Sequence, residues 1–246
     1  MRVSKAKLNK YALLRHKKYR DKEGLFMVQG EKAVADTLGK FELESILTSN
    51  PTKYDQLSSK YPIQELSEPE VRKISTLEKL PDIIAIYKKP DPTHDLKADK
   101  NEYTLVLDGI QDPGNLGTII RTAHWFGIKK IFCSIETVDV YNPKVVMATM
   151  GSIASVEVLY CNLEDLFENN PDYPVYGLLL EGENIFSIGK ITPGFIVMGS
   201  EGHGPAINTC NRISRAFTIP AADPSDSPDS LNVAVATAIT ISQLVK

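Results

Sequence analysis

The second half of the chain alternates short apolar runs with polar, glycine-rich turns and amphipathic segments. The apolar runs predict strands at residues 103–107, 130–133, 155–159, 175–180, 195–198 and 215–219. The amphipathic segments predict helices at residues 116–126, 143–150, 163–168, 206–210 and 230–244. Alternating strands and helices with short apolar strands indicate an α/β domain, built on a mostly parallel sheet that helices cover on both faces.

The first part of the chain has the pattern of a smaller α/β domain. Helical patterns occur at residues 8–20, 33–38, 54–59 and 69–74, and strand patterns at residues 25–28, 43–47, 63–66 and 83–87. Residues 88–101 are polar, contain Pro90 and Pro92 and have no apolar period, so they read as a linker. The chain is therefore predicted to hold one domain at residues 1–90 and a second at residues 101–246.

Composition places the chain among ordinary globular proteins. It has 246 residues, of which 42% are hydrophobic and 24% charged. No apolar run approaches the roughly 18–20 residues of a membrane span, and no apolar stretch follows the basic start as in a signal peptide. Three scattered cysteines, Cys133, Cys161 and Cys210, suggest reduced thiols rather than a disulfide framework. We therefore expect a cytoplasmic protein with no membrane partner.

Charge is distributed unevenly along the chain. Residues 1–24 hold nine basic and two acidic residues, a net charge of +7, whereas the whole chain carries −3, which leaves −10 on the rest. A basic N-terminal arm on an acidic body is a candidate surface for RNA phosphates. The alternative, a solvated helix face or tail, stays open at this stage.

The first candidate site follows the predicted strand at residues 103–107. It reads Asp108-Gly109-Ile110-Gln111-Asp112-Pro113-Gly114-Asn115-Leu116-Gly117, with Arg121 six residues after Asn115. Asn115 is a good helix N-cap, and the guanidinium of Arg121 suits a phosphate. The segment lacks both G-x-G-x-x-G and a Walker lysine, which argues against a dinucleotide or P-loop site. The same residues have a purely structural interpretation, in which Asn115 only caps the helix and Arg121 is only a surface charge.

Two further segments repeat this arrangement of strand, polar loop and helix. The second is Gly199-Ser200-Glu201-Gly202-His203-Gly204, which displays Glu201 and whose His203 has no marked nucleophile beside it. In the third, the loop from Ile219 leads into Ser230-Leu231-Asn232-Val233, where Asp229 or Ser230 is predicted to cap the last helix. Loops at the carboxyl ends of parallel strands can meet at one ligand.

Taken together and in this order, the three segments resemble the SpoU-type (TrmH-like) branch of the SPOUT superfamily of RNA methyltransferases. The shared pattern is N-L-G with an arginine six residues after the asparagine, then G-x-E-G-x-G, then I-P followed by S-L-N-V. The first domain is similar to that family's substrate-binding domain, which is related to the ribosomal L30e-like fold, and its Phe26-Met27-Val28-Gln29-Gly30-Glu31 carries the likeness. The resemblance covers nearly the whole chain.

The resemblance implies a knotted C-terminal domain and a homodimer that transfers a methyl group from S-adenosylmethionine to a ribose 2′-hydroxyl of rRNA or tRNA. It implies Arg121 as the catalytic residue, supported by Asn115, Glu201, Ser230 and Asn232, and a cofactor held at Gly199, Ile219 and Leu231. No metal is expected, because the four histidines have no ligand spacing with cysteines or acids.

The chain departs from the family pattern in the third segment. Ala221 replaces a methionine, and the stretch from Ile219 to Ser230 is about three residues longer than usual, which bears on the rim of the cofactor pocket. A catalytically inactive protein of this fold that only binds RNA is the alternative function. A nucleotide-dependent oxidoreductase or a hydrolase is disfavoured, because the chain has neither G-x-G-x-x-G nor a Ser/His/Asp set.

Overall fold

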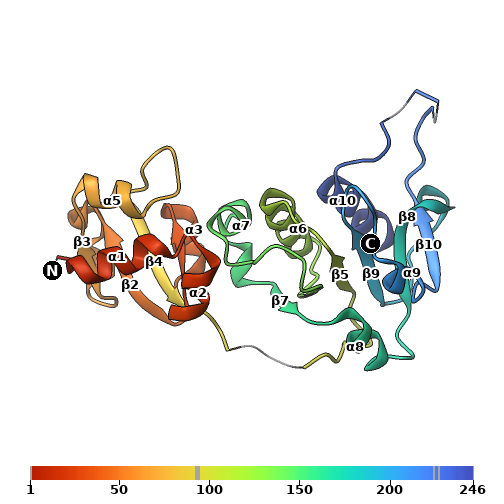
Figure 1. Cartoon of the computed structure of the whole chain (residues 1–246), viewed down its shortest axis with the longest axis horizontal. Helices are drawn as coiled ribbons and strands as arrows, with labels where there is room; N and C mark the ends of the chain where they lie inside the picture. The colour runs from red at the N-terminus through yellow and green to blue at the C-terminus, as the bar shows by residue number, and fades with distance from the viewer. Residues whose placement is uncertain (1, 92–94, 224, 227, 246) are drawn as a thin grey trace. The chain divides into compact units, whose positions relative to one another are not determined.

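The computed structural model describes residues 2–91, 95–223, 225–226 and 228–245 (Figure 1). By their contacts these residues form two units. The N-terminal unit comprises Met1–Asp91 together with Asp139–Ala154, and the C-terminal unit comprises Pro92–Val138 and Ser155–Lys246. The linker prediction at residues 88–101 falls partly outside the described residues.

The N-terminal unit is built on a four-stranded sheet in the order β1-β4-β2-β3. Its strands are β1 (Leu25–Gln29), β2 (Leu43–Thr48), β3 (Ile63–Glu65) and β4 (Ile83–Lys88). β4 pairs antiparallel with both β1 and β2, whereas β2 and β3 run parallel. All four strands lie where the apolar runs predicted them, within two residues at each end.

Short helices surround this sheet: α1 (Lys5–Leu13), α2 (Lys17–Glu23), α3 (Glu31–Thr37), η1 (Pro51–Tyr54), α4 (Asp55–Ser58) and α5 (Glu68–Ile74). The single helix predicted over residues 8–20 is wrong, because the chain breaks between α1 and α2. The guanidinium of Arg20 donates to the carbonyls of Leu14 and Arg15 at 2.9 and 3.0 Å. These carbonyls would otherwise accept the next helical N–H groups, so the arginine replaces the helix at the break.

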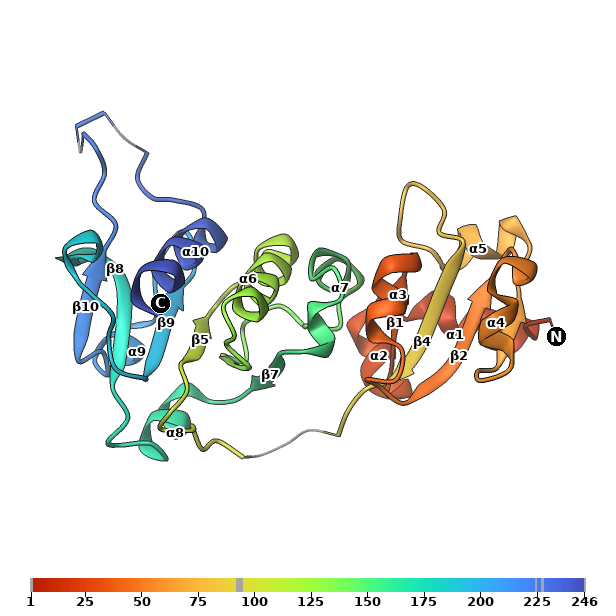
Figure 2. The same cartoon turned by 180° about the vertical axis from the view of Figure 1, so that it is seen from behind.

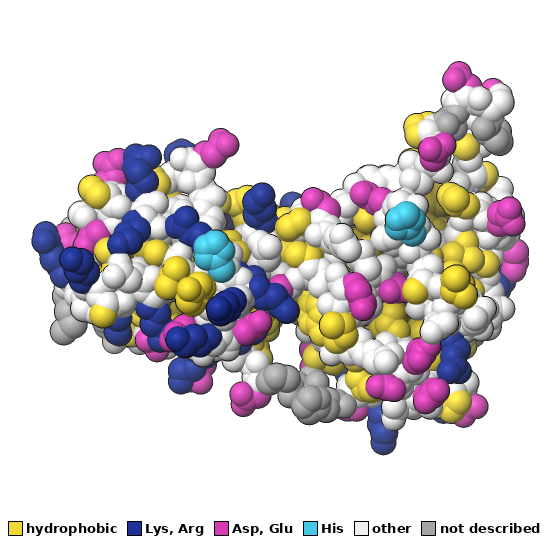
Figure 3. Space-filling view, in the orientation of Figure 1, with side chains coloured by type: hydrophobic (Ala, Val, Ile, Leu, Met, Phe, Trp, Pro, Cys, Tyr) yellow, Lys and Arg dark blue, Asp and Glu magenta, His cyan; other side chains and the backbone are white. Residues whose placement is uncertain are grey.

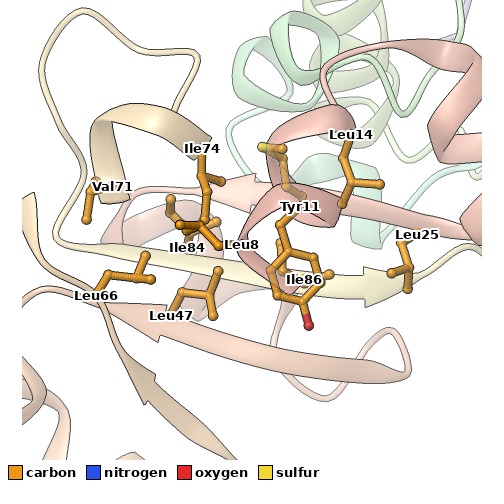
Figure 4. Close-up of a cluster of buried hydrophobic side chains, with 11 residues drawn as sticks. Leu8, Tyr11, Leu14, Leu25, Leu47, Leu66, Val71, Ile74, Ile84 and Ile86 are labelled. Carbon is orange, nitrogen blue, oxygen red and sulfur yellow. The ribbon is translucent and has the colours of Figure 1, made fainter. Parts of the chain in front are cut away.

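The hydrophobic core of the N-terminal unit lies between α1, α5 and the sheet. Leu8, Tyr11 and Leu14 follow each other at intervals of three and are buried, so they form one face of α1 and its cap. Figure 4 shows them beside Ile84 and Ile86 of β4. The basic N-terminal segment is thus a packed part of the fold rather than a free tail.

The segment Asp139–Ala154 belongs to the N-terminal unit, although it lies inside the span predicted for the second domain. It contains α7 (Pro143–Ala148) and η2 (Ser152–Ala154). The ring of Tyr141 lies 4.6 Å from that of Phe26 on β1. Arg20 donates from Nε and Nη2 to Asp139 Oδ2 at 2.9 and 2.5 Å, and both side chains are buried. A buried ion pair therefore joins this segment to the sequence's first helices.

The C-terminal unit has a six-stranded sheet in the order β10-β8-β9-β5-β6-β7, in which every neighbouring pair is parallel. Its strands are β5 (Thr104–Asp108), β6 (Lys130–Cys133), β7 (Glu157–Tyr160), β8 (Val175–Asn184), β9 (Phe195–Gly199) and β10 (Arg215–Thr218). The predicted α/β architecture with a parallel sheet is confirmed. β8 extends four residues beyond its prediction, because its polar end pairs with β10 after a register shift.

Helices cover both faces of this sheet (Figures 1 and 2). They are α6 (Pro113–Trp125), η3 (Ile185–Ser187), α8 (Leu163–Glu168), α9 (Ile207–Cys210) and α10 (Val233–Leu244). α6 packs against α10, and α8 packs against α9. Within the described residues, none of the helices combines the length and the apolar character that a membrane crossing requires.

Candidate active site

Three loops of the C-terminal unit begin where β5, β9 and β10 end. The three strands belong to one parallel sheet, so their carboxyl ends lie at the same edge. The loop after β5 leads into α6, and the loop after β10 leads into α10. This edge therefore collects the three segments that the sequence singled out.

The carboxylate of Glu201, in the loop after β9, joins the three segments. Its Oε1 accepts hydrogen bonds from Asn115 Nδ2 at 3.0 Å, Asn232 Nδ2 at 2.7 Å and the backbone N–H of Val233 at 3.2 Å. Asn232 Nδ2 also donates to Asn115 Oδ1 at 2.9 Å. The structure thus brings Asn115, Glu201 and Asn232 together in one network.

Asn115 reaches this network from inside α6. The prediction that it caps the helix is wrong, because α6 begins at Pro113 and Asp112 is its N-cap. Asp112 Oδ1 accepts from the backbone N–H of Asn115 at 2.8 Å, and proline is favoured at the first helical position. Since the aspartate provides the cap, the amide side chain of Asn115 is left to bind Glu201.

Asn232 caps α10, which begins three residues later than predicted. Its Oδ1 accepts from the N–H groups of Ala234 and Val235 at 3.1 and 3.3 Å. Asp229 and Ser230 are exposed and do not cap the helix. One amide thus performs two tasks: its oxygen caps α10, and its nitrogen binds Glu201 and Asn115.

A cavity of about 750 Å³ opens beside this network in the C-terminal unit. Its lining comes from the loop after β5, the loop after β9, the segment after β6 and the start of α10: Asp108, Gly109, Ile110, Gln111, Asp112, Asn115, Glu136, Ser200, Glu201, Gly202, His203, Gly204, Pro205, Ala206 and Val233. Drug-sized ligands occupy cavities of about 300–1,000 Å³. The space is therefore large enough for a nucleoside.

The carboxylates around the cavity differ in their bonding. Asp108 accepts from the N–H of Ala206 at 2.8 Å and fixes the loop after β9 to the end of β5. Sequence reasoning missed Asp108, although an acid at the end of an apolar strand was the available signal. Asp112 accepts from the N–H of Asn115, and Glu201 accepts from Asn115, Asn232 and Val233. Glu136 has no hydrogen-bond or ion-pair partner within the part of the chain that the structure describes.

Gly199 ends β9 and is buried. A Cβ at this glycine would lie 2.0 Å from the backbone of Gly204 and of Pro205. The loop after β9 folds back so closely on Gly199 that it excludes a side chain there, whether or not a ligand is bound. The family resemblance implies Gly199 as a cofactor position, and the structure adds this requirement of the loop itself.

The remaining predicted residues lie outside the network. Arg121 is exposed on α6, does not line the cavity, and has no bonding partner among the described residues. Ser230 is exposed, Leu231 is 47% exposed, and Ile219 packs against a small apolar cluster that includes Phe217. None of these four residues lines the cavity.

Known proteins are similar to this chain along nearly its whole length. The model of the SpoU rRNA Methylase family matches residues 102–242, and that of the MRM3-like substrate binding domain matches residues 5–85. A 23S rRNA (guanosine(2553)-2′-O)-methyltransferase of Bacillus subtilis is 28% identical over 97% of this chain and 95% of its own.

Solved structures agree with these matches. A protein of the TrmH family of RNA methyltransferases from Porphyromonas gingivalis is 34% identical, with a TM-score of 0.87 and 98% of both chains covered. An rRNA methyltransferase from Sinorhizobium meliloti with AdoMet bound is 27% identical, with a TM-score of 0.85 over 98% of this chain and 95% of that one.

Proposed function

The chain belongs to the SpoU rRNA Methylase family, and from that premise we propose that it methylates a ribose 2′-hydroxyl of ribosomal RNA with S-adenosylmethionine as the donor. The observation that carries this proposal is the network of Asn115, Glu201 and Asn232, in which three segments far apart in the sequence meet. The relative and the structural neighbour named above are described as methyltransferases, one of them with AdoMet bound, so the catalytic function is favoured over the inactive alternative.

The residues at the carboxyl edge of the sheet fit S-adenosylmethionine. Leu231 and Leu180 are large apolar side chains with exposed fractions of 47% and 79%, and flat heterocycles bind well to such surfaces. Thr218 Oγ1 donates to the carbonyl of Leu180 at 2.9 Å, which fixes Leu180 beside the start of the third loop. The bound cofactor supplies a methyl group on a sulfonium, and we assign its binding to Gly199, Ile219 and Leu231.

The protein's own residues must align the acceptor hydroxyl and stabilise its oxygen as the proton leaves. Alignment is catalysis by positioning, and the network performs it by joining the starts of α6 and α10 to the loop after β9. We propose that Arg121 stabilises the developing alkoxide or holds the adjoining phosphate, because its guanidinium is always charged and has no bonding partner among the residues that the structure describes. Ser230 lies in the third segment, two residues before Asn232, and we propose its hydroxyl as a supporting hydrogen-bond donor.

We propose that the C-terminal unit is knotted, with α10 threaded past the connection between β8 and β9. α10 packs against η3, which lies in that connection. Gln243 Nε2 donates to the carbonyl of Ile188 at 2.9 Å, and Ile191 donates its N–H to the carbonyl of Leu244 at 3.3 Å. These bonds hold the end of the chain against a loop formed much earlier.

We further propose a homodimer through α6 and α10. Trp125 at the end of α6 is 85% exposed, and Val235 on α10 is 50% exposed. α10 also contains no charged residue along its length, and an apolar helix with exposed side chains suits an interface. Trp125→Glu should convert the dimer to a monomer in sedimentation; a wild-type protein that is already monomeric overturns this proposal.

The N-terminal unit is proposed to bind the RNA. Several of its basic side chains already form ion pairs within the protein, namely those of Lys7, Lys10, Lys17 and Arg20. Lys18 and Lys22 on α2 have no such partner among the described residues. On the face drawn in Figure 3, Lys and Arg gather on this unit. Lys18→Glu with Lys22→Glu should flatten the salt dependence of RNA binding by about 0.7 in log–log slope per lost contact.

The proposed reaction is tested with S-adenosylmethionine that carries a trideuterated methyl group. The protein is incubated with ribosomal RNA from a strain that lacks the gene, in the presence of a metal chelator, and the RNA is digested to nucleosides for mass spectrometry. The deuterated group is expected on a 2′-O-methyl nucleoside. A label on a base, or no label, overturns the proposal, and loss of the reaction on chelation overturns the expectation that no metal takes part.

A further inference from the structure

The cavity beside the network has no assigned occupant. The cofactor positions, Gly199, Ile219 and Leu231, do not line it. The network residues Asn115 and Glu201 do line it, so the cavity lies on one side of the residues that we propose align the acceptor hydroxyl. The cavity is therefore available to the other substrate, the RNA.

The lining determines which part of an RNA nucleotide can enter. It includes four carboxylates and neither lysine nor arginine. A phosphate would meet only like charge there and would also lose its hydration. A base is uncharged and presents hydrogen-bond donors and acceptors at its edge. The occupant that fits is therefore the base, with the phosphates left outside.

The uncommitted side chains determine which base fits. Glu136, Gln111 and His203 line the cavity and have no bonding partner among the residues that the structure describes. An ionised carboxylate only accepts hydrogen bonds and can accept two side by side. Guanine alone among the four bases offers two adjacent donors on its Watson–Crick edge, N1–H and N2–H. Gln111 and His203 line the same cavity, and their side chains can donate a hydrogen bond to the neighbouring O6.

We propose that this cavity receives the base of the nucleotide to be methylated and that Glu136 selects guanosine by accepting from N1–H and N2–H. The proposal rests on the proposed methyl transfer and adds its nucleotide specificity. Glu136 comes from the segment after β6, on the far side of β5 from β9, and sequence reasoning did not single it out. Glu136 is a specificity-determining residue in this account, since it contacts the base rather than the reacting atoms.

The test compares wild type with Glu136→Gln and Glu136→Ala, and uses Asp172→Asn as the control because Asp172 is an exposed carboxylate outside the cavity. The substrate is ribosomal RNA from a strain without the gene, and the four 2′-O-methyl nucleosides are separated after reaction with deuterated S-adenosylmethionine. Wild type should label 2′-O-methylguanosine alone. The glutamine variant should lose about 10- to 100-fold in kcat/KM, the range for one paired contact to a base, and the control should lose nothing.

A second readout does not depend on turnover. Ligand-detected NMR, with S-adenosylhomocysteine present, should show guanosine 5′-monophosphate binding to wild type more tightly than adenosine 5′-monophosphate does, and the preference should vanish in Glu136→Gln. Labelling of adenosine, cytidine or uridine by wild type overturns the base assignment, as does an unchanged preference in the variant. Absence of any labelled nucleoside overturns the proposed function itself and this inference with it.

Discussion

Asn115 and Asn232 are 117 positions apart in the chain, yet Asn232 Nδ2 lies 2.9 Å from Asn115 Oδ1. Both amides also donate to the same carboxylate oxygen of Glu201. The bond therefore joins the first turn of α6 to the cap of α10 across the end of β9. The three loops form one site because these side chains connect them.

The two tasks of Asn232 can be separated by substitution. Asn232→Ala removes the N-cap of α10, which costs about 1 kcal/mol of stability, and also removes the donor to Glu201. Asn232→Asp keeps the capping oxygen but places a second carboxylate against Glu201. Two adjacent carboxylates raise the pKa of one of them, so lowering the pH protonates the pair and restores a donor.

Methyl transfer by Asn232→Asp should therefore rise relative to that by Asn232→Ala as the pH falls from 8 to 6. Rates on ribosomal RNA across this range, with unfolding curves for both variants, check the prediction. A ratio of the two rates that is constant with pH would show that the donor to Glu201 is unimportant.

Gly199 and Gly202 form a matched pair in the loop after β9. A Cβ at Gly199 would lie 2.0 Å from the backbone of Gly204 and of Pro205, whereas one at Gly202 would have nothing within 4 Å. Gly199→Ala should displace the loop that carries Glu201 and weaken both methyl transfer and cofactor binding. Gly202→Ala should keep cofactor binding close to wild type, as calorimetry with S-adenosylmethionine can establish. Equal effects of the two substitutions would contradict this account.

The pattern of apolar positions predicted the strands of both units, because most of them are short apolar runs between polar turns, and β1, β4, β5, β6 and β9 are largely buried. It also predicted that the loops around Asn115, Glu201 and Asn232 meet, since parallel strands share a carboxyl edge. It failed at the helix starts. Asp112 and Asn115 are both good caps, and their competition is decided by Pro113 and by the partner that Glu201 offers to Asn115.

Two other features depend on tertiary contacts that no local pattern encodes. The break after α1 follows from the guanidinium of Arg20, which binds the carbonyls of Leu14 and Arg15. The place of Asp139–Ala154 in the N-terminal unit follows from the pairing of Arg20 with Asp139. Both features depend on Arg20, which in the sequence is only one of the nine basic residues of the N-terminal segment.

Removing one partner of the buried ion pair between Arg20 and Asp139 should strongly destabilise the protein. Arg20 is 2% and Asp139 9% exposed, and a buried charge left alone costs about 3–5 kcal/mol. Asp139→Ala should lower the free energy of unfolding by that amount in urea. Arg72→Ala, which breaks an exposed pair with Glu68, should cost at most about 0.5 kcal/mol. A similar cost for both variants would contradict the structural role of the buried pair.

The three thiols should differ in reactivity. Burial raises the pKa of the Cys161 thiol to about 11 and also raises that of Cys133, so the reactive thiolate is scarce at both residues at pH 8. Cys210 is only partly buried. Iodoacetamide at pH 8 should alkylate Cys210 first, and Cys133 and Cys161 only after unfolding, as peptide mass spectrometry can follow. Early labelling of Cys133 would contradict the packing of β6.

The most direct test of the central claim, that the three loops act as one methyl-transfer site, is a double-mutant cycle between Asn115 and Glu201. Asn115→Ala and Glu201→Gln should each lower kcat on ribosomal RNA by roughly 10²-fold, because a displaced site loses its alignment. Since both variants break the same network, the double variant should be little slower than either single one. A double variant whose loss equals the product of the two single losses would show that the residues act independently and would contradict the account.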